Sequence, residues 1–251
     1  MKTQQSFEIL YGIHPVGEAL TAKKRNLVEL YVSNQKTSGQ YQHLIERAQH
    51  ANIPVSYLSI DQLNTLCKNA SHQGVCLRSG CFPCISLENL LSHVNTSSSS
   101  PLLLILDSIQ DPHNVGALIR TAVSVGVTGI LLPKDRSASL TPTVSKTSAG
   151  ALEHATVVQV TNLVQAIKQL KKQGIWIAGM DKASQLSIYS CKFTDPVALV
   201  IGGEQNGLRM LVKKHCDFLL SIPQLGPVES LNASVAGAIV LYEAYRQRFV
   251  G

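Results

Sequence analysis

LLSIPQLGPVESLNASVA, residues 219–236, is the stretch of sequence around which the rest of this chain is organised. It begins as a short apolar strand that ends at Pro223, and a loop containing Gly226 and Pro227 follows. Asn232 comes just before the next apolar run, where its side chain can cap the first N–H groups of a helix. The stretch therefore predicts a loop at the carboxyl end of a strand, which is where α/β sheets bind their ligands.

Two other loops are predicted to meet this one. DPHNVGALIRTA, residues 111–122, follows a buried strand and should open a helix near Asn114, whose side chain we expect to accept a backbone N–H. LVIGGEQNGL, residues 199–208, ends a strand in glycines, which allow a ligand to approach the backbone closely. Its G-G-x-x-x-G spacing differs from the dinucleotide fingerprint, and it follows a late strand. We expect the three loops to form one site.

Arg120 lies about one and a half turns beyond Asn114 on the predicted helix. Its neighbours are apolar and few acidic residues are near, so we expect it to bind a phosphate or a paired carboxylate rather than to be plain surface charge. Glu204 is the lone acidic residue of the glycine-rich loop and could hold this guanidinium. The pair links the second loop to the helix that follows the first.

Composition limits the class of protein. The chain has 251 residues, of which 45% are hydrophobic and 15% charged, so it is globular and long enough for one large or two small domains. A net charge of +6 favours an anionic partner such as nucleic acid, although a mildly basic enzyme without a polyanion also fits. No apolar run is long enough to cross a membrane, and the first residues lack a signal-peptide core. We therefore expect a cytoplasmic protein.

Six cysteines occur, and cytosolic thiols usually stay reduced, so no disulfide framework is predicted. Cys81 and Cys84 have C-x-x-C spacing, but no second pair completes a zinc site and no thioredoxin-like pattern surrounds them. We predict no metal centre.

Two domains are expected. Residues 1–78 predict a small α/β unit, residues 79–84 a linker, and residues 85–251 a domain in which strands alternate with helices and form a parallel sheet. Strands are expected at 28–32, 54–57, 75–78, 102–106, 129–132, 157–160, 175–180, 197–201 and 218–222. Helices are expected at 16–22, 41–51, 59–66, 85–94, 115–125, 163–173, 209–216 and 233–249.

Two basic stretches could contact phosphates. Residues 23–25 are Lys-Lys-Arg, which predicts either a solvated loop or a phosphate contact. Residues 134–150, KDRSASLTPTVSKTSAG, place Lys134, Arg136 and Lys146 among hydroxyl side chains. A bland loop is possible there, but a basic, hydroxyl-rich loop suits phosphate and 2′-OH recognition better.

The motifs resemble those of the SpoU–TrmH family of RNA ribose 2′-O-methyltransferases. Its three motifs occur in order as DPHNVGALIRTA, LVIGGEQNGL and IPQLGPVESLNASVAGAIVLYEA. YGIHPVGEAL and SHQGV near the N-terminus resemble the family's L30e-like RNA-binding domain. LPKDRSASL, VTNL, IWIAG and YRQR are most similar to the branch that methylates guanosine in 23S rRNA.

The resemblance implies a homodimer, a C-terminal domain with a deep trefoil knot (the SPOUT fold) and S-adenosylmethionine as cofactor. It also implies two sets of site residues. The catalytic set is Arg120, Asn114, Glu204, Ser230 and Asn232, and the cofactor-binding set is Gly202, Gly203, Ile222, Pro223, Leu231 and Asn232. The sequence departs from the family pattern at Gln205, Pro227 and Glu229, which affects loop shape and substrate contacts rather than the core motifs.

The implied reaction is an in-line attack of a ribose 2′-OH on an activated methyl group, in which positioning supplies much of the rate. Because a guanidinium almost never loses its proton, we expect Arg120 to anchor a phosphate and stabilise the developing alkoxide, oriented by Glu204, rather than to act as base. Asn114 and Ser230 would orient the ribose.

Three alternatives remain. The substrate could be tRNA or another rRNA site, or the chain could be an RNA-binding protein that has lost catalysis. A nucleotide-dependent oxidoreductase is disfavoured because no G-x-G-x-x-G follows the first strand.

Overall fold

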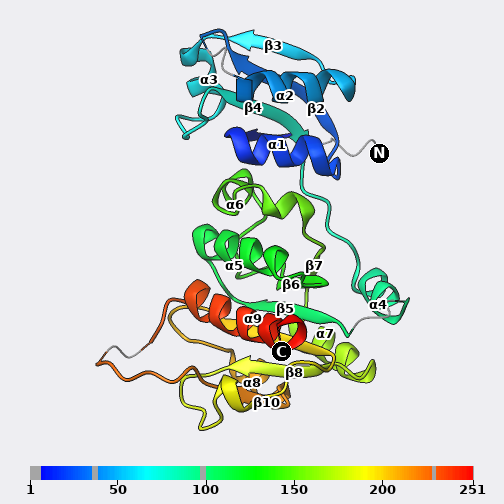
Figure 1. Ribbon diagram of the computed structural model, residues 1–251, viewed down its shortest axis with the longest axis vertical. Helices are drawn as coiled ribbons and strands as arrows, with labels where there is room; N and C mark the ends of the chain where they lie inside the picture. The colour runs from blue at the N-terminus through cyan, green and yellow to red at the C-terminus, as the bar shows by residue number, and fades with distance from the viewer. Residues whose placement is uncertain (1–6, 36–38, 97–99, 228–229, 251) are drawn as a thin grey trace. The chain divides into compact units, whose positions relative to one another are not determined.

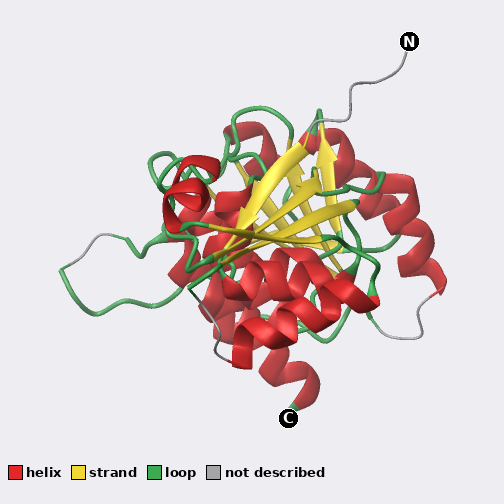
Figure 2. Cartoon of the chain, turned by 90° about the horizontal axis from the view of Figure 1, so that it is seen from above, coloured by secondary structure: helices red, strands yellow, loops and turns green. Residues whose placement is uncertain are grey.

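The computed structural model describes residues 7–35, 39–96, 100–227 and 230–250 (Figure 1). The chain forms two compact units, Met1–Pro83 with Leu140–His154 and Cys84–Ser139 with Ala155–Gly251. Helices flank the strands (Figure 2). The domain limits expected from the sequence, 1–78 and 85–251, stay a prediction.

The first unit is built on a four-stranded sheet in the order β1-β4-β2-β3, in which β2 and β3 are parallel and the other pairs antiparallel. The core lies between one face of this sheet and the helices α1 and α2. In chain order its elements are β1 (Phe7–Tyr11), α1 (Ile13–Ala22), β2 (Leu27–Ser33), α2 (Gly39–His50), β3 (Val55–Leu58), α3 (Ile60–Leu66), β4 (Val75–Gly80), α6 (Pro142–Thr147) and the 3-10 helix η1 (Ala151–His154).

Local signals in this unit were mostly confirmed. Ser59 and Gln62 form the expected capping box at the start of α3, because each side chain bonds the other's backbone N–H. The strand β1 was not expected. The side chains of FEILY point alternately to the two faces of the sheet, and both faces are partly covered. The segment therefore lacks the alternation of polar and apolar residues that predicts a strand from sequence.

The segment Leu140–His154 contains α6 and η1 and belongs to the first unit, although residues 134–150 were expected to be a loop. Pro142 occupies an early position of α6, where its fixed φ and missing N–H cost nothing. The helix η1 packs on α1, and α6 packs on β1. The segment is therefore a structural part of the N-terminal sheet unit, although some 60 residues separate it from that unit along the chain.

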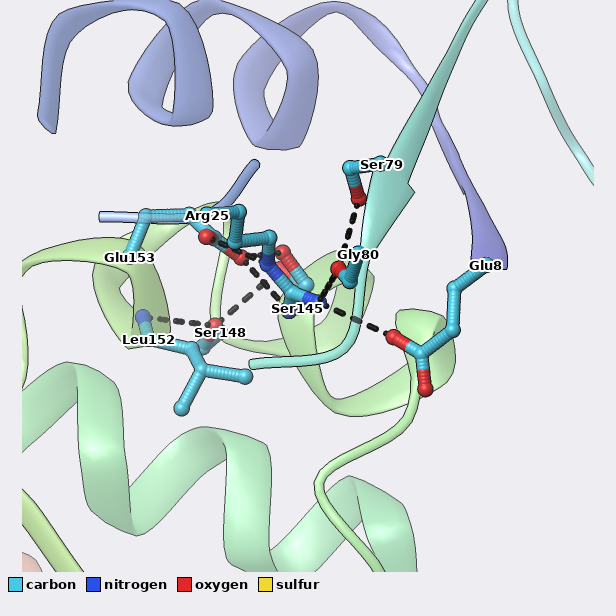
Figure 3. A network of polar contacts seen from close by, with 8 residues as sticks. All are labelled: Glu8, Arg25, Ser79, Gly80, Ser145, Ser148, Leu152 and Glu153. Carbon is cyan, nitrogen blue, oxygen red and sulfur yellow. Dashed lines mark hydrogen bonds and ion pairs between the residues drawn. The ribbon is translucent and has the colours of Figure 1, made fainter. Parts of the chain in front are cut away.

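Arg25 fixes this segment in place (Figure 3). Its Nε and Nη2 donate to Glu153 at 2.8 and 3.1 Å, and its Nη1 donates to Glu8 at 2.9 Å. The Arg25 side chain is completely buried, and Ser145 donates to the same Glu153 at 2.7 Å. Arg25 is thus neither a solvated loop residue nor a phosphate contact, the two alternatives expected for residues 23–25.

The second unit is an α/β domain with a fully parallel six-stranded sheet in the order β10-β8-β9-β5-β6-β7. The parallel sheet expected from the alternation of strands and helices is confirmed, while the knotted path stays a prediction. Its elements are α4 (Leu87–Thr96), β5 (Leu102–Asp107), α5 (Pro112–Ser124), β6 (Gly129–Pro133), β7 (Val157–Val160), α7 (Leu163–Lys172), β8 (Trp176–Met180), the 3-10 helix η2 (Ile188–Ser190), β9 (Val197–Gly202), α8 (Met210–His215), β10 (Phe218–Leu220) and α9 (Ala233–Phe249).

Helices cover the two faces of this sheet. One core is made by α4, α7 and α8 against residues of β5, β6, β7, β8 and β9. The helices α5 and α9 pack on one another, and α9 contacts β9. They meet closely at Gly237, where an added Cβ would lie 2.2 Å from a methyl of Leu118 and 3.5 Å from Ile201. Within the described ranges, no helix is long and apolar enough to cross a membrane.

Candidate functional site

A cavity of about 470 Å³ opens at the carboxyl ends of β8, β9 and β10. This is the end of a parallel sheet where α/β proteins bind ligands, because the loops that follow neighbouring strands meet there. Its walls come from the ends of those strands, the glycine-rich loop and the start of α9. The lining residues are Met180, Asp181, Lys182, Ile201, Gly202, Gly203, Glu204, Gln205, Asn206, Gly207, Leu208, Lys213, Leu220, Ser221, Ile222, Gln224, Ser230, Leu231, Ala233 and Ala236.

The glycines give the second loop its shape. The chain folds back on itself after β9, and the N–H of Gly207 donates to the carbonyl of Gly203 at 2.9 Å. A Cβ on Gly202 would lie 2.2 Å from the carbonyl carbon of Gly207, and one on Gly203 would lie 2.7 Å from the carbonyl oxygen of Ser108. Only glycine fits at either position. The close approach to Ser108 also brings the second loop beside the turn that leads into the first loop, as expected.

One chain of hydrogen bonds joins all three motifs. Asn232 caps α9 with its Oδ1, which accepts from the N–H of Ser234 at 2.8 Å and of Val235 at 3.3 Å. Its Nδ2 donates to Asn114 Oδ1 at 3.1 Å. Asn114 Nδ2 in turn donates to Glu204 Oε1 at 2.5 Å. The expected capping role of Asn232 is confirmed, and the amide of Asn114 is fixed from both sides.

The helix α5 begins earlier than the sequence reading placed it, and Asn114 is not its cap. Asp111 is the N-cap and accepts from the N–H of His113 at 2.8 Å, with Pro112 in the first turn. Aspartate is a strong capping residue, and proline suits the first helical position, so the pair fixes the start. The side chain of Asn114 is therefore free to bond Asn232 and Glu204, and it is largely buried.

Arg120 lies on the exposed side of α5, and Glu204 bonds Asn114 instead of Arg120. The prediction that Arg120 and Glu204 form an ion pair is therefore wrong, because no such pair is present among the described residues. The reason is helical geometry. Arg120 comes six positions after Asn114, which places the two side chains about 120° apart around the helix and about 9 Å apart along it.

The remaining predicted site residues divide into two groups. Six of them line the cavity: Gly202, Gly203, Glu204, Ile222, Ser230 and Leu231. Pro223, Asn114, Asn232 and Arg120 do not belong to its lining, although Asn114 and Asn232 adjoin it through Glu204. Glu229 lies outside the described residues, and Gln205 lines the cavity.

The sequence reading missed two ion pairs at this end of the sheet. Asp181 lies on the cavity wall and pairs with Lys213. Burial alone would raise the pKa of Asp181, but the bonds from Lys213 and the Ala183 N–H lower it overall. Asp107, completely buried at the end of β5, accepts from Arg209 Nε at 2.6 Å and from the Arg209 N–H at 2.8 Å. A polar residue ending a buried apolar run was the available signal for Asp107.

The described residues contain no cluster of three or more His, Cys, Asp or Glu side chains that could hold a metal ion. The charged groups near the cavity are instead paired with one another or exposed to solvent. The arrangement suits a small molecule held mainly by backbone groups, with a carboxylate, Glu204, on the wall.

Comparisons with known proteins give a consistent result. Residues 101–242 match the SpoU rRNA Methylase family, and residues 9–79 match the RNA 2′-O ribose methyltransferase substrate binding family. The 23S rRNA (guanosine-2′-O-)-methyltransferase RlmB of Neisseria meningitidis is 42% identical over 95% of both chains. The putative TrmH family tRNA/rRNA methyltransferase YacO of Bacillus subtilis is 39% identical over 97% of both.

Among solved structures, the SpoU methyltransferase AviRb of Streptomyces viridochromogenes, in complex with the cofactor AdoMet, superposes with a TM-score of 0.83. The match covers 100% of this chain and 94% of AviRb at 23% identity, so it is a likeness of fold.

Proposed function

The chain belongs to the SpoU rRNA Methylase family, and we propose that it transfers the methyl group of S-adenosylmethionine to the 2′-OH of a guanosine in 23S rRNA. The observation that carries the proposal is the hydrogen-bonded chain Asn232–Asn114–Glu204, because it joins the three motifs beside one cavity. Relatives named for this reaction are 38–42% identical over nearly the whole chain.

The cavity fits the cofactor in size and in character. Its volume of about 470 Å³ lies within the range of small-molecule sites, roughly 300–1,000 Å³. Gly202 and Gly203 contribute backbone to the cavity wall, while Ile222 and Leu231 add apolar surface. These four residues would hold S-adenosylmethionine, with Pro223 and Asn232 shaping the loop between them. When bound, the cofactor supplies a methyl group activated by a sulfonium.

The protein's own residues would then hold the ribose and stabilise the charged groups of the bound cofactor and substrate. Glu204 places a carboxylate on the cavity wall, which favours a cationic ligand there. Asn114 keeps that carboxylate in one orientation, and Asn232 keeps Asn114 in place. Ser230, on the wall and exposed, is positioned to hydrogen-bond a ribose hydroxyl. A preorganised set of this kind needs little rearrangement when substrate binds.

Arg120 would act in the site of a second copy of the chain. It lies about 120° around α5 from Asn114 of its own chain, and a guanidinium is a poor base, so it would anchor a phosphate rather than accept a proton. The neighbouring helix α9 exposes Val235, Tyr242 and Phe249, an apolar set suited to a subunit contact. We therefore propose a homodimer in which each subunit completes the other's site.

The test is methyl transfer from labelled S-adenosylmethionine to unmodified 23S rRNA fragments, with unmodified tRNA as a parallel substrate and the product mapped by primer extension. We expect one 2′-O-methylated guanosine in the 23S fragments. Modification of tRNA alone would show that the substrate is tRNA and not 23S rRNA. The name of YacO, a putative tRNA/rRNA methyltransferase, is compatible with either substrate. Cofactor and RNA binding without any methyl transfer would indicate an RNA-binding protein that lacks catalysis.

A further inference from the structure

A second cavity, of about 390 Å³, lies in the same unit at the carboxyl ends of β6 and β7. The loop between β9 and α8 has one cavity on either side: Leu208 lines the first cavity, and the next residue, Arg209, lines the second. The residues that line the second cavity are Arg136, Thr161, Asn162, Leu163, Val164, Arg209, Met210, Leu211 and Val212. Of these described residues, only the two arginines are charged.

Arg209 is held rigidly. Its Nε donates to the buried carboxylate of Asp107, and its own backbone N–H donates to the other oxygen of that carboxylate. Its side chain is 37% exposed, and within the described part of the chain its two terminal nitrogens have no protein partner. A guanidinium fixed by one edge presents the other two donors in a set direction, which is the geometry that binds a phosphate with two bonds.

Arg136 is exposed and has a backbone φ of 59°, an uncommon conformation for a residue other than glycine. The next residues tie it to the loop before the first motif, because Ser137 Oγ and the Ala138 N–H both donate to the carbonyl of Ile109 at 3.2 and 2.9 Å. The position of Arg136 thus depends on the loop that ends at Asp111, the N-cap of α5. The start of α7, capped by Asn162, adds its positive end to the same cavity.

We propose that this second cavity binds a backbone phosphate of the RNA substrate through Arg209 and Arg136. The inference rests on the proposed function, since it assigns the RNA a path from the cofactor cavity across the loop Gly202–Arg209. Asp107 pairs in register with Gly202, so one strand-end pair supports both the cofactor loop and the phosphate-binding guanidinium. Arg209 is a substrate-binding residue in this view, and Asp107 is a positioning residue.

The experiment measures binding of an unmodified 23S rRNA fragment by fluorescence anisotropy at four or more salt concentrations. The variants are Arg136→Ala and Arg209→Lys, which keeps the ion pair to Asp107 but removes the forked donors. Lys168→Ala is the matched control, because Lys168 is an exposed cation of α7 that does not line the cavity. We expect RNA affinity to fall about three- to tenfold in each arginine variant and to stay near wild type in Lys168→Ala, and we expect the salt slope of Arg136→Ala to drop by about 0.7.

Cofactor affinity, measured by calorimetry, should stay within twofold of wild type in all three variants. Unchanged RNA affinity and salt slope in both arginine variants would overturn the inference, and it would do so even if the wild-type protein methylates rRNA. Dissociation of the protein into monomers with RNA affinity intact would also overturn it, by showing that the cavity is a subunit contact. Loss of RNA affinity in a protein that transfers no methyl group would instead leave the phosphate site standing and remove the proposed function.

Discussion

Two hydrogen-bonded clusters join distant parts of this chain, and they differ in their access to water. Arg25 in the first unit is completely buried, and its guanidinium donates to Glu153, Glu8 and the Gly80 carbonyl (Figure 3). Glu204 in the second unit is exposed, and only one of its oxygens is bonded among the described residues. The first cluster is satisfied within the protein, whereas the second leaves an acceptor at a cavity.

This difference in access to water distinguishes a structural cluster from a functional one more clearly than the types of residue in the cluster do. Both clusters contain a carboxylate held by a nitrogen donor, and both link segments some 90 to 130 residues apart. A buried cluster must be complete, because an unpaired buried charge is costly. An exposed cluster can keep polar atoms that have no protein partner, and those atoms can bind a ligand. Breaking the two clusters should therefore have different effects: the protein loses stability in one case and activity in the other.

The largest expected effect is on the buried cluster. Arg25→Met should lower the free energy of unfolding by about 3–5 kcal/mol, because it leaves Glu153 buried without its cation. Urea denaturation followed by circular dichroism measures it. Lys23→Met, at an exposed neighbouring cation, is the control and should change stability by no more than about 0.5 kcal/mol. The double variant Arg25→Met/Glu153→Gln should recover part of the loss, and equal stability of the double and single variants would contradict the stated cause.

The next effect concerns Arg120, which lies outside both clusters. Arg120→Lys should reduce turnover about 10²- to 10³-fold, because lysine lacks the forked donors, while cofactor affinity stays unchanged in calorimetry. Mixing this variant with Ser230→Ala under conditions that exchange subunits should restore up to about a quarter of wild-type activity, since some mixed dimers contain one intact site. Absence of restoration would place Arg120 and Ser230 in a site made by one chain.

A smaller effect is expected at the exposed cluster. Asn114→Asp replaces the donor that faces Glu204 with a second carboxylate and should reduce kcat/KM about 10- to 100-fold, the worth of a hydrogen bond to a charged group. Steady-state methyl transfer measures it, with His113→Ala at the exposed neighbour as control. A loss of stability as large as that of Arg25→Met, with activity per folded molecule retained, would show that the two clusters do not differ in role.

The smallest effect is a pH dependence of the first unit. Burial lowers the pKa of His72 below its ordinary value of 6.5, and both ring nitrogens are bonded, to Asn64 and to the Gly74 N–H. The unfolded chain therefore binds the proton more readily, so the contribution of His72 to stability is complete above pH 6.5 and is lost as the pH falls through the lowered pKa. Unfolding midpoints at pH 7.5 and 5.5 should differ less in His72→Gln than in wild type.

Local signals predicted the fold where a few neighbouring residues decide the outcome. Asn232 caps α9, the capping box starts α3, and the strand β7 has the expected limits. Each depends on side chains that bond the backbone within four residues or on a short β-branched run. The cavity could be placed because the carboxyl ends of parallel strands share one edge of a sheet.

Contacts between distant segments could not be predicted in the same way. Nothing near Arg25 indicates that its partner is Glu153, 128 residues away, and nothing near Glu204 selects Asn114 over Arg120. The start of α5 was misplaced because Asn114 and Asp111 are both good capping residues, and Pro112 decides between them only once it is given its first-turn position. Which partner a side chain bonds depends on how distant segments pack, and that packing is determined by the whole fold and not by neighbouring residues in the sequence.

The composition of the first unit from two separate segments also sets the order in which a newly made chain can mature. Domains usually fold as units while synthesis proceeds at about 5–20 residues per second. The N-terminal sheet leaves the ribosome first, but Glu153, the counter-ion of the buried Arg25, follows only after the roughly 70 further residues up to His154. For several seconds of translation, then, all four strands of the N-terminal sheet have been synthesised but Glu153 has not. During that time Arg25 has no carboxylate from η1 with which to pair.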